Sequence, residues 1–478
     1  MEDRGPVVRE ALCCIMTKPA DAKWTGNTSL FQFRHWLTDA IRLAQYRRMA
    51  VLNDQMPRCG FGCRNSISAG FIAPLAIALL LILMLAPLAA HAQGRIQLPR
   101  TGLTPEDLAV IVNDSDPLSR QIGDYYQKVR GIPSENMIHL RFPAGRDVLS
   151  SDEFQQLKAE IDHAVPAHVQ AYAVAWTSPY RVDCMSLTSA LAFGFDERYC
   201  SSSCGPTQSS PYFNSPSQHP ANDHKLRPSM MLAGVDFQQV KLLIDRGVAA
   251  DHSFPSGRAY LVVTADKARS VRAVNFELAA KELNRVFPVE IIETEAISNR
   301  RDILFYFTGQ VHVPQLDTLA FLPGALADHL TSTGGQLTGL DQMSSLRWLE
   351  AGATASYGTV VEPCNHLQKF PFPGIAMFHY ALGATAIEAY WKSVAWPGEG
   401  VFVGEPLSQP FGPDLKEVHP GQFELQVFSP RETRLRIERS KSAAGPFQPV
   451  AQQAQIRRGA NRLRFKFSDP DGYLRLRW

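Results

Sequence analysis

Short, wholly apolar runs alternate with amphipathic segments between residues 95 and 412. Residues 108–113 (LAVIVN) have the pattern of a buried strand, and 117–130 carries apolar side chains at helical spacing. The alternation continues, with strands predicted at 137–142, 171–176, 259–264, 289–294, 303–308, 319–322 and 353–361, and helices at 151–165, 237–246, 271–285 and 375–394. Strands that are apolar on both faces are typical of a parallel sheet between helices. We therefore predict an α/β domain over 95–412, with a parallel-rich sheet and helices on both of its faces.

Two regions depart from this pattern. Residues 183–257 are rich in Ser, Pro and Cys and predict a long insertion. After residue 413 the chain alternates polar and apolar positions at 423–428, 433–438, 462–467 and 473–477. This period of two predicts a small antiparallel, sandwich-like β domain over 418–478.

The C-terminal β domain is strongly basic, although the whole chain carries a net charge of only +2. Residues 431–478 hold 12 basic and 4 acidic side chains. One interpretation is a surface that binds an envelope polyanion or glycan. The other is that arginines on solvated edge strands prevent aggregation. The nearly balanced charge of the whole chain argues against a nucleic-acid partner.

An uncharged apolar run at 71–90 ends in Ala90-His91-Ala92. An apolar run followed by A-x-A is the pattern of a signal peptide and its cleavage site. We predict a signal peptide or membrane anchor at 68–92. Residues 1–67 are then either a mis-called extension, with the true start at an internal residue such as Met56, or a cytoplasmic tail. Both alternatives place the rest of the chain in the periplasm or outside the cell, attached to the inner membrane only if 71–90 is uncleaved.

Four of the eight cysteines follow the predicted export segment: Cys184, Cys200, Cys204 and Cys364. An even number in an oxidising compartment predicts two disulfides. Cys364 with Cys184 is the pairing we favour, because both follow predicted strand ends. The Cys-x₃-Cys spacing at 200–204 with His219 or His224 is the zinc alternative, but a second tight ligand pair is missing. We expect no metal and no cofactor.

The sequence lacks the phosphate-binding loop, the dinucleotide-binding glycines, the zinc-peptidase helix and the nucleophile elbow. Polar residues instead follow the predicted strand ends, where parallel sheets bind ligands. The candidate binding residues are Asp114, Trp176, Tyr180, Arg181, Asp266, Gln310 and Glu362. Cys364 is the candidate nucleophile, with His312 or His366 as the imidazole that would lower the pKa of its thiol.

Several segments resemble a family of uncharacterised exported bacterial proteins, a resemblance that covers about 100–412. They are NDSDPLS at 113–119, SPYRVDC at 178–184, YGTVVEPCNH at 357–366 and VGEPLSQPF at 403–411. That resemblance implies export and no particular activity.

More distantly, the chain resembles gingipain-type cysteine peptidases. This resemblance implies a caspase-like fold in which one strand ends at a catalytic His and the next at a nucleophilic Cys. Here the strand at 303–308 ends in Gly309-Gln310, and the next predicted strand enters Pro323-Gly324-Ala325. Both catalytic positions therefore depart from that pattern.

We predict an exported binding or scaffold module on a peptidase-like scaffold that lacks the usual dyad. The first alternative is a cysteine hydrolase that acts on peptides through Cys364 and a nearby histidine. The second is a binder of an envelope polyanion or glycan through the basic β domain. The partner would accordingly be a peptide or a cell-envelope polyanion.

Overall fold

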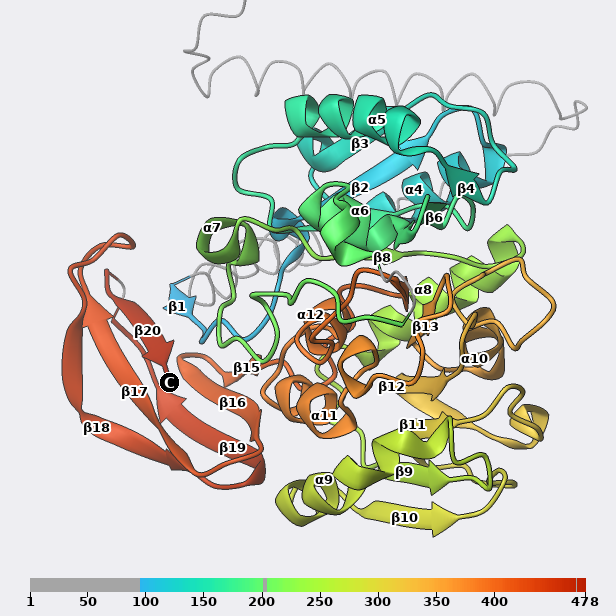
Figure 1. The fold of residues 1–478 in the computed structure, drawn as a ribbon. Coiled ribbons are helices and arrows are strands. Elements are labelled where there is room, and N and C mark those ends of the chain that lie inside the picture. The colour runs from blue at the N-terminus through green and yellow to red at the C-terminus, as the bar shows by residue number, and fades with distance from the viewer. Residues whose placement is uncertain (1–94, 201–203, 470) are drawn as a thin grey trace, which may run out of the picture. The chain divides into compact units, whose positions relative to one another are not determined.

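The computed structural model describes residues 95–200, 204–469 and 471–478 (Figure 1). The predicted extension at 1–67 and the predicted signal or anchor at 68–92 lie outside these residues. Within the described part of the chain, no helix is both long and apolar enough to cross a membrane. The described residues form a mixed α/β structure with one large sheet, nine α-helices and three small sheets.

The large sheet has ten strands in the order β10-β9-β11-β12-β13-β14-β8-β5-β2-β3. In this order the strands span Val289–Glu293, Arg258–Val263, Ile303–Gly309, Phe321–Leu330, Ala355–Thr359, Gly400–Gly404, Ser229–Met231, Ala171–Val174, Leu108–Asn113 and Met137–Leu140. β2 is buried along its whole length, and its neighbouring residues Val110 and Ile111 belong to two different core clusters. Both faces of the sheet are therefore covered, as its wholly apolar strands require.

The sheet is mixed, because one of its pairs of neighbouring strands is antiparallel. β14 is antiparallel to β13 and parallel to β8. Because the chain returns at the edge where β13 ends, Thr359 pairs with Gly400 at the start of β14. The remaining neighbours are parallel, so the strands from β10 to β13 run opposite to those from β14 to β3. The carboxyl ends of the two halves consequently lie at opposite edges of the sheet.

The helices begin and end at residues suited to those positions. They are α4 (Pro117–Arg130), α5 (Ser151–Ala164), α6 (Leu187–Phe193), α7 (Pro220–His224), α8 (Phe237–Ala250), α9 (Phe276–Leu283), α10 (Leu346–Ala351), α11 (Pro373–Ala381) and α12 (Ala386–Trp391). The side chain of Asp116 accepts the amide hydrogen of Leu118 at the start of α4, and Gly131 ends that helix with φ of 66°. Ser150 and Glu153 form a capping box at the start of α5.

Two of the small sheets contain the C-terminal strands and enclose one apolar core. One is β1-β20-β17-β18, spanning Ile96–Gln97, Tyr473–Arg477, Thr433–Ser440 and Gln448–Ile456. The other is β15-β16-β19, spanning Asp414–His419, Gln422–Ser429 and Gly459–Lys466. β1 pairs with β20 in parallel and every other pair in these two sheets is antiparallel. The third small sheet is β4-β6-β7, spanning Val148–Leu149, Arg181–Val182 and Met185–Ser186.

Three elements differ from their predicted form. The predicted helix at 375–394 is two helices, α11 and α12, separated at Gly383, which has φ of 87°. The predicted insertion at 183–257 contains β8, a buried strand in the middle of the large sheet. The strand predicted at 319–322 continues to Leu330 as β12.

Candidate functional site

Four parallel strands, β9, β11, β12 and β13, bring their carboxyl ends to one edge of the large sheet. The loops that follow these strands meet there. A hollow of about 260 Å³ opens between the loops after β9, β12 and β13. We call it the edge hollow, and its lining residues are Ala268, Arg269, Leu330, Thr331, Ser332, Glu362, Pro363, Cys364, Asn365 and Phe370.

Arg269 is oriented at the edge hollow by its own loop. Asp266 accepts a hydrogen bond from the Arg269 amide at 3.1 Å and pairs with the guanidinium at 2.8 Å. Arg269 Nε also donates to the hydroxyl of Thr331 at 3.3 Å, and Thr331 donates to Gln342 Oε1 at 2.5 Å. The guanidinium is therefore fixed between two loops, and 24% of the Arg269 side chain is exposed to solvent.

A glycine allows the loop after β9 to approach the end of β11. A Cβ atom on Gly309 would lie 1.9 Å from the carbonyl oxygen of Arg269, which no side chain tolerates. The hydroxyl of Thr264 donates to the Gly309 carbonyl at 2.7 Å. This close approach sets the position of Arg269 relative to β12.

Cys364 forms a disulfide with Cys204, and 5.4 Å separates their Cα atoms. Glu362 accepts a hydrogen bond from the Cys364 amide at 2.7 Å, and Asn365 donates to the loop after β9 at 3.3 Å. Nε2 of His366 lies 2.6 Å from the carbonyl oxygen of Cys204 and donates to it. Cys364 therefore contributes a disulfide sulfur to the wall of the hollow, and a disulfide sulfur is not a nucleophilic thiolate.

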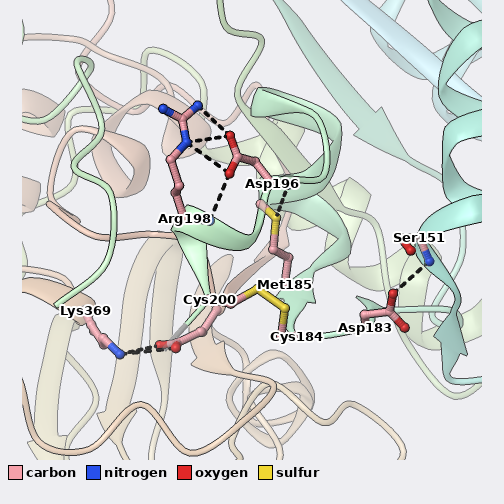
Figure 2. Close-up of a disulfide and its surroundings, with 9 residues drawn as sticks. Ser151, Asp183, Cys184, Met185, Asp196, Arg198, Cys200 and Lys369 are labelled. Atoms are coloured by element: carbon pink, nitrogen blue, oxygen red, sulfur yellow. Dashed lines mark hydrogen bonds and ion pairs between the residues drawn. A yellow bond between two sulfur atoms is a disulfide. The ribbon is translucent and has the colours of Figure 1, made fainter. Parts of the chain in front are cut away.

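The second disulfide joins Cys184 and Cys200, whose Cα atoms are 5.6 Å apart (Figure 2). Our preferred pairing of Cys364 with Cys184 is wrong, because the turn between β6 and β7 places Cys184 beside the 3₁₀ helix η3 (Glu197–Tyr199) that precedes Cys200. The prediction of two disulfides from these four cysteines is confirmed. Cys200 and Cys204 are four positions apart, so the two disulfides anchor both ends of one short segment.

A fully buried ion pair lies near the Cys184–Cys200 disulfide (Figure 2). Lys369 Nζ is 2.9 Å from a carboxylate oxygen of Glu399, and their side chains are 0% and 1% exposed. Tyr357 donates its hydroxyl hydrogen to the carbonyl of Lys369 at 2.5 Å. Burial raises the pKa of Tyr357 well above its ordinary value, so this hydroxyl stays protonated and acts as a donor.

Buried charges also connect η4 (Ser270–Asn275) with β12. Arg272 pairs with Asp328 at 2.6 Å, with both side chains at most 3% exposed. Burial raises the pKa of Asp328 to about 6, although Arg272 acts in the opposite direction. Arg272 also donates to the carbonyl of Thr308 at the end of β11. This pair contacts no solvent and holds the strands behind the candidate site.

His329 follows Asp328 and is fully buried. Its Nδ1 accepts a hydrogen bond from Trp348 Nε1 at 2.9 Å, and its Nε2 donates to the carbonyl of Met343 at 3.0 Å. Burial lowers the pKa of His329 to about 3, so the ring is neutral at physiological pH. Because both ring nitrogens are engaged, His329 cannot serve as a base for a ligand in the edge hollow.

The structure brings some of the predicted residues together and leaves others apart. Asp266, Glu362, Cys364 and His366 lie at the edge hollow or contact its wall. His312 is exposed and lines a different hollow of about 410 Å³. Gln310 follows β11 but donates to Glu295 at 3.3 Å instead of lining the edge hollow. His312 and Cys364 therefore do not share a cavity.

The other predicted binding residues follow strands of the opposite half of the sheet. Asp114 follows β2 and is 2.8 Å from His139 Nδ1. Trp176 is 3% exposed and donates to the carbonyl of Pro179 at 3.0 Å, so it belongs to the core. Asp114 and Cys364 follow strand ends at opposite edges of the sheet, because β14 reverses the strand direction between them.

Tyr180 and Arg181 lie on the segment that leaves β5. Tyr180 is 5% exposed, and its hydroxyl is 3.4 Å from Thr338 in the loop after β12. Burial raises the pKa of Tyr180, which keeps the hydroxyl protonated. Arg181 is half-buried in the short strand β6. Neither residue lines the edge hollow.

Thr331 and Ser332 line the edge hollow and were missed from the sequence. They directly follow Leu330, the last residue of β12. The predicted strand at 319–322 ends before Pro323 and Gly324, since both residues usually interrupt strands. The apolar residues that follow, 325–327, are the signal that the strand continues.

Among the described residues, no group of three or more His, Cys, Asp or Glu side chains is arranged to hold a metal ion. The zinc alternative fails for a specific reason: Cys200 and Cys204 are both bonded to other cysteines. Zinc binds thiolates rather than disulfide sulfurs. His224, one of the two histidines proposed as alternative zinc ligands, has its Nε2 atom 2.8 Å from the hydroxyl of Ser215.

No family model matches the chain, and no curated protein matches it. A solved structure described as "Structure of Protease" is similar, with a TM-score of 0.35 and 10% sequence identity. The match covers 76% of this chain and 98% of that chain. Fold and site together define a mixed α/β protein with a disulfide-walled hollow at one edge of its large sheet.

Proposed function

We propose that this chain is an extracytoplasmic binding module on a peptidase-like scaffold, which holds a peptide segment in the edge hollow without cleaving it. The observation that carries the proposal is the disulfide between Cys204 and Cys364 in the wall of the hollow. A cysteine peptidase needs a thiolate next to an imidazole at this place. In this chain the sulfur of Cys364 is bonded to the sulfur of Cys204, so it is not a thiolate.

The residues around the hollow give a further reason to expect binding rather than cleavage. β11 is followed by Gln310 and β12 by Thr331, so neither strand end offers the His or Cys of a dyad. His366 is turned to the Cys204 carbonyl, and His312 lines another hollow. Among the described residues that line the edge hollow, no imidazole is therefore paired with a hydroxyl or thiol.

The lining of the hollow suits a peptide. The hydroxyls of Thr331 and Ser332 and the amide of Asn365 can bond the N–H and C=O groups of an extended chain. Leu330 and Phe370 add apolar surface. A small number of polar groups on an apolar surface is the usual composition of a binding site.

The two disulfides agree with an oxidising compartment, where such bonds persist. The apolar run at 71–90 supplies the signal or anchor that export requires. We therefore place the binding module in the periplasm or outside the cell. The intact mass of the protein recovered from that compartment measures where its N-terminus lies.

The test is a peptide library presented to the oxidised full-length protein, with binding and cleavage both measured. We expect retained peptides and no cleavage products. Ala268 is exposed at the rim, so the indole of Ala268→Trp should obstruct the edge hollow. The peptide then cannot reach the polar groups that line the hollow, and its affinity should fall about tenfold or more. Leu340→Trp, placed in the hollow that His312 lines, is the matched control and should bind normally.

The rival function is a cysteine hydrolase in which Cys364 acts after its disulfide is reduced. Its specific support is the neighbouring pair Glu362 and His366 on the same short segment. Peptide cleavage that appears with a reductant and disappears in Cys364→Ser would establish the hydrolase and overturn the binding module. Retention of uncleaved peptide with and without reductant would exclude it.

A further inference from the structure

The two C-terminal sheets differ in how the charges on their outer faces are neutralised. On the sheet β15-β16-β19, Glu424 lies between Arg462 at 3.3 Å and Arg464 at 2.7 Å. Lys416 pairs with Asp414 at 2.7 Å on the same sheet. Cations and carboxylates therefore alternate on this face, as on an ordinary solvated surface.

The other sheet carries arginines without such partners. Leu435, Leu474 and Leu476 belong to the core between the two sheets. Since side chains alternate along a strand, the positions next to these leucines point outward. Three exposed arginines stand there, and we call them the arginine face: Arg434 and Arg436 on β17, and Arg477 on β20.

The arginine face concentrates positive charge. Arg436 and Arg477 are direct partners across the ladder. Facing side chains in such a pair have Cβ atoms about 5 Å apart, and like charges there destabilise a sheet. Within the described ranges, no carboxylate lies within 4.0 Å of any of the three guanidinium groups. The neighbouring Glu438 is already paired with Arg475 at 2.6 Å.

Protection against aggregation does not explain the position of Arg436. The sheet order is β1-β20-β17-β18, so both β17 and β20 have a hydrogen-bonded neighbour on each side. Charges that block edge-to-edge association are needed on edge strands. Arg436 pairs with Gln453 on one side and with Arg477 on the other, so it lies inside the sheet and its repulsion of Arg477 needs another explanation.

We propose that the arginine face binds an anionic polysaccharide. Arginine donates two parallel hydrogen bonds to carboxylate, sulfate or phosphate groups and stays charged at every physiological pH. The exposed amides of Gln453 and Gln455 stand opposite Arg436 and Arg434 and can bond sugar hydroxyls.

The test uses the full-length protein and immobilised dextran sulfate, with neutral dextran as the uncharged control. We expect binding to dextran sulfate that weakens as salt rises, because screening weakens exposed charges. The triple variant Arg434→Gln, Arg436→Gln and Arg477→Gln should bind at least about tenfold more weakly, since three charge-assisted contacts are lost. Thermal unfolding of each variant checks that it is folded.

The matched control removes the same number of positive charges from the other sheet. The triple variant Arg462→Gln, Arg464→Gln and Lys466→Gln lowers the net charge equally and should keep its affinity within about twofold. Equal losses in both triple variants would show a diffuse charge effect and overturn the site. Equal affinity for duplex DNA through the same arginines would overturn the polysaccharide class, and so would absent binding at physiological salt. Peptide binding in the edge hollow is measured separately, so either proposal can fail without the other.

Discussion

The indole N–H of Trp348 donates a hydrogen bond to Nδ1 of His329 across 2.9 Å, inside the core. Nε2 of the same ring donates to a backbone carbonyl, so the neutral ring satisfies both of its nitrogens. A protonated ring would turn Nδ1 from an acceptor into a donor that faces another donor. His329 thus makes the stability of this chain depend on pH.

We predict that acid destabilises the protein through His329. Burial lowers its pKa to about 3 in the folded chain, against about 6.5 when unfolded. Between these values only the unfolded state binds the proton, so the free energy of unfolding falls as the pH falls. Relative to His329→Gln, whose amide can make both hydrogen bonds, the wild type should lose about 2.5 kcal/mol between pH 7 and pH 4.5. Urea unfolding at the two pH values measures this difference.

Asp328 is present in both proteins, so its own titration cancels in that difference. His312→Gln, a change at an exposed histidine, is the control and should follow the wild type at both pH values. Identical pH dependence in the wild type and His329→Gln would contradict the prediction.

The ion pair between Lys369 and Glu399 gives a second prediction. Both side chains are at most 1% exposed, so Glu399→Gln leaves a buried ammonium without its counter-charge. We expect the free energy of unfolding to fall by about 3–5 kcal/mol. Replacing both residues, as Lys369→Met with Glu399→Leu, should cost much less, because no charge is then buried. Urea unfolding compares the two variants.

The exposed pair Lys158–Asp162 provides the control for that experiment. Asp162 is 49% exposed, and Asp162→Asn should change the stability by less than about 0.5 kcal/mol. If Glu399→Gln lowered the free energy of unfolding no more than Asp162→Asn does, the ion pair would not be buried as described.

The two disulfides should differ in their contribution to stability. Cys204–Cys364 closes a loop with a sequence separation of 160, and Cys184–Cys200 one of 16. The chain entropy of the unfolded state then predicts losses of about 5 and about 3 kcal/mol when each pair is replaced by serines. Denaturant unfolding of the two double variants shows which disulfide contributes more to the free energy of unfolding. A larger loss for the short loop would contradict the entropic origin of the difference.

Gly309→Ala should strongly destabilise the chain. The added Cβ would lie 1.9 Å from the carbonyl oxygen of Arg269, so β11 or the loop after β9 must move. We expect a loss of about 3 kcal/mol or more, as for severe overpacking. Gly131→Ala is the matched control: Gly131 is in the left-handed helical region with φ of 66°, but no atom lies within 4 Å of the added Cβ, so the cost should be about 1 kcal/mol. Thermal and urea unfolding of both variants compare the loss of stability caused by the steric clash with the loss caused by the positive φ alone.

Local elements were predictable because neighbouring residues determine them. The apolar run that forms β2 and the helical spacing that forms α4 both agree with the structure. Gly131 directly follows α4 and ends the helix with a positive φ. The presence of two disulfides followed from the number of cysteines and the expected compartment.

The candidate site was only partly predictable. Asp266, Glu362 and Cys364 were recognised because they follow apolar strands, and they lie at or beside the edge hollow. Thr331 was missed because β12 continues through Pro323, a residue that normally disfavours a strand. The pairing of Cys364 with Cys204 depends on where two distant loops meet, which no local pattern encodes.

The amino-acid sequence by itself determined the apolar strands, the capped helices, the basic C-terminal strands and the cysteines available for disulfides. Each of these depends on side chains within a few positions of one another. Only the tertiary structure decided the reversed direction of β14, the partner of each cysteine and the alignment of Arg436 with Arg477. These features depend on contacts between residues far apart in the chain. Such contacts stabilise the protein only after the strands have packed together.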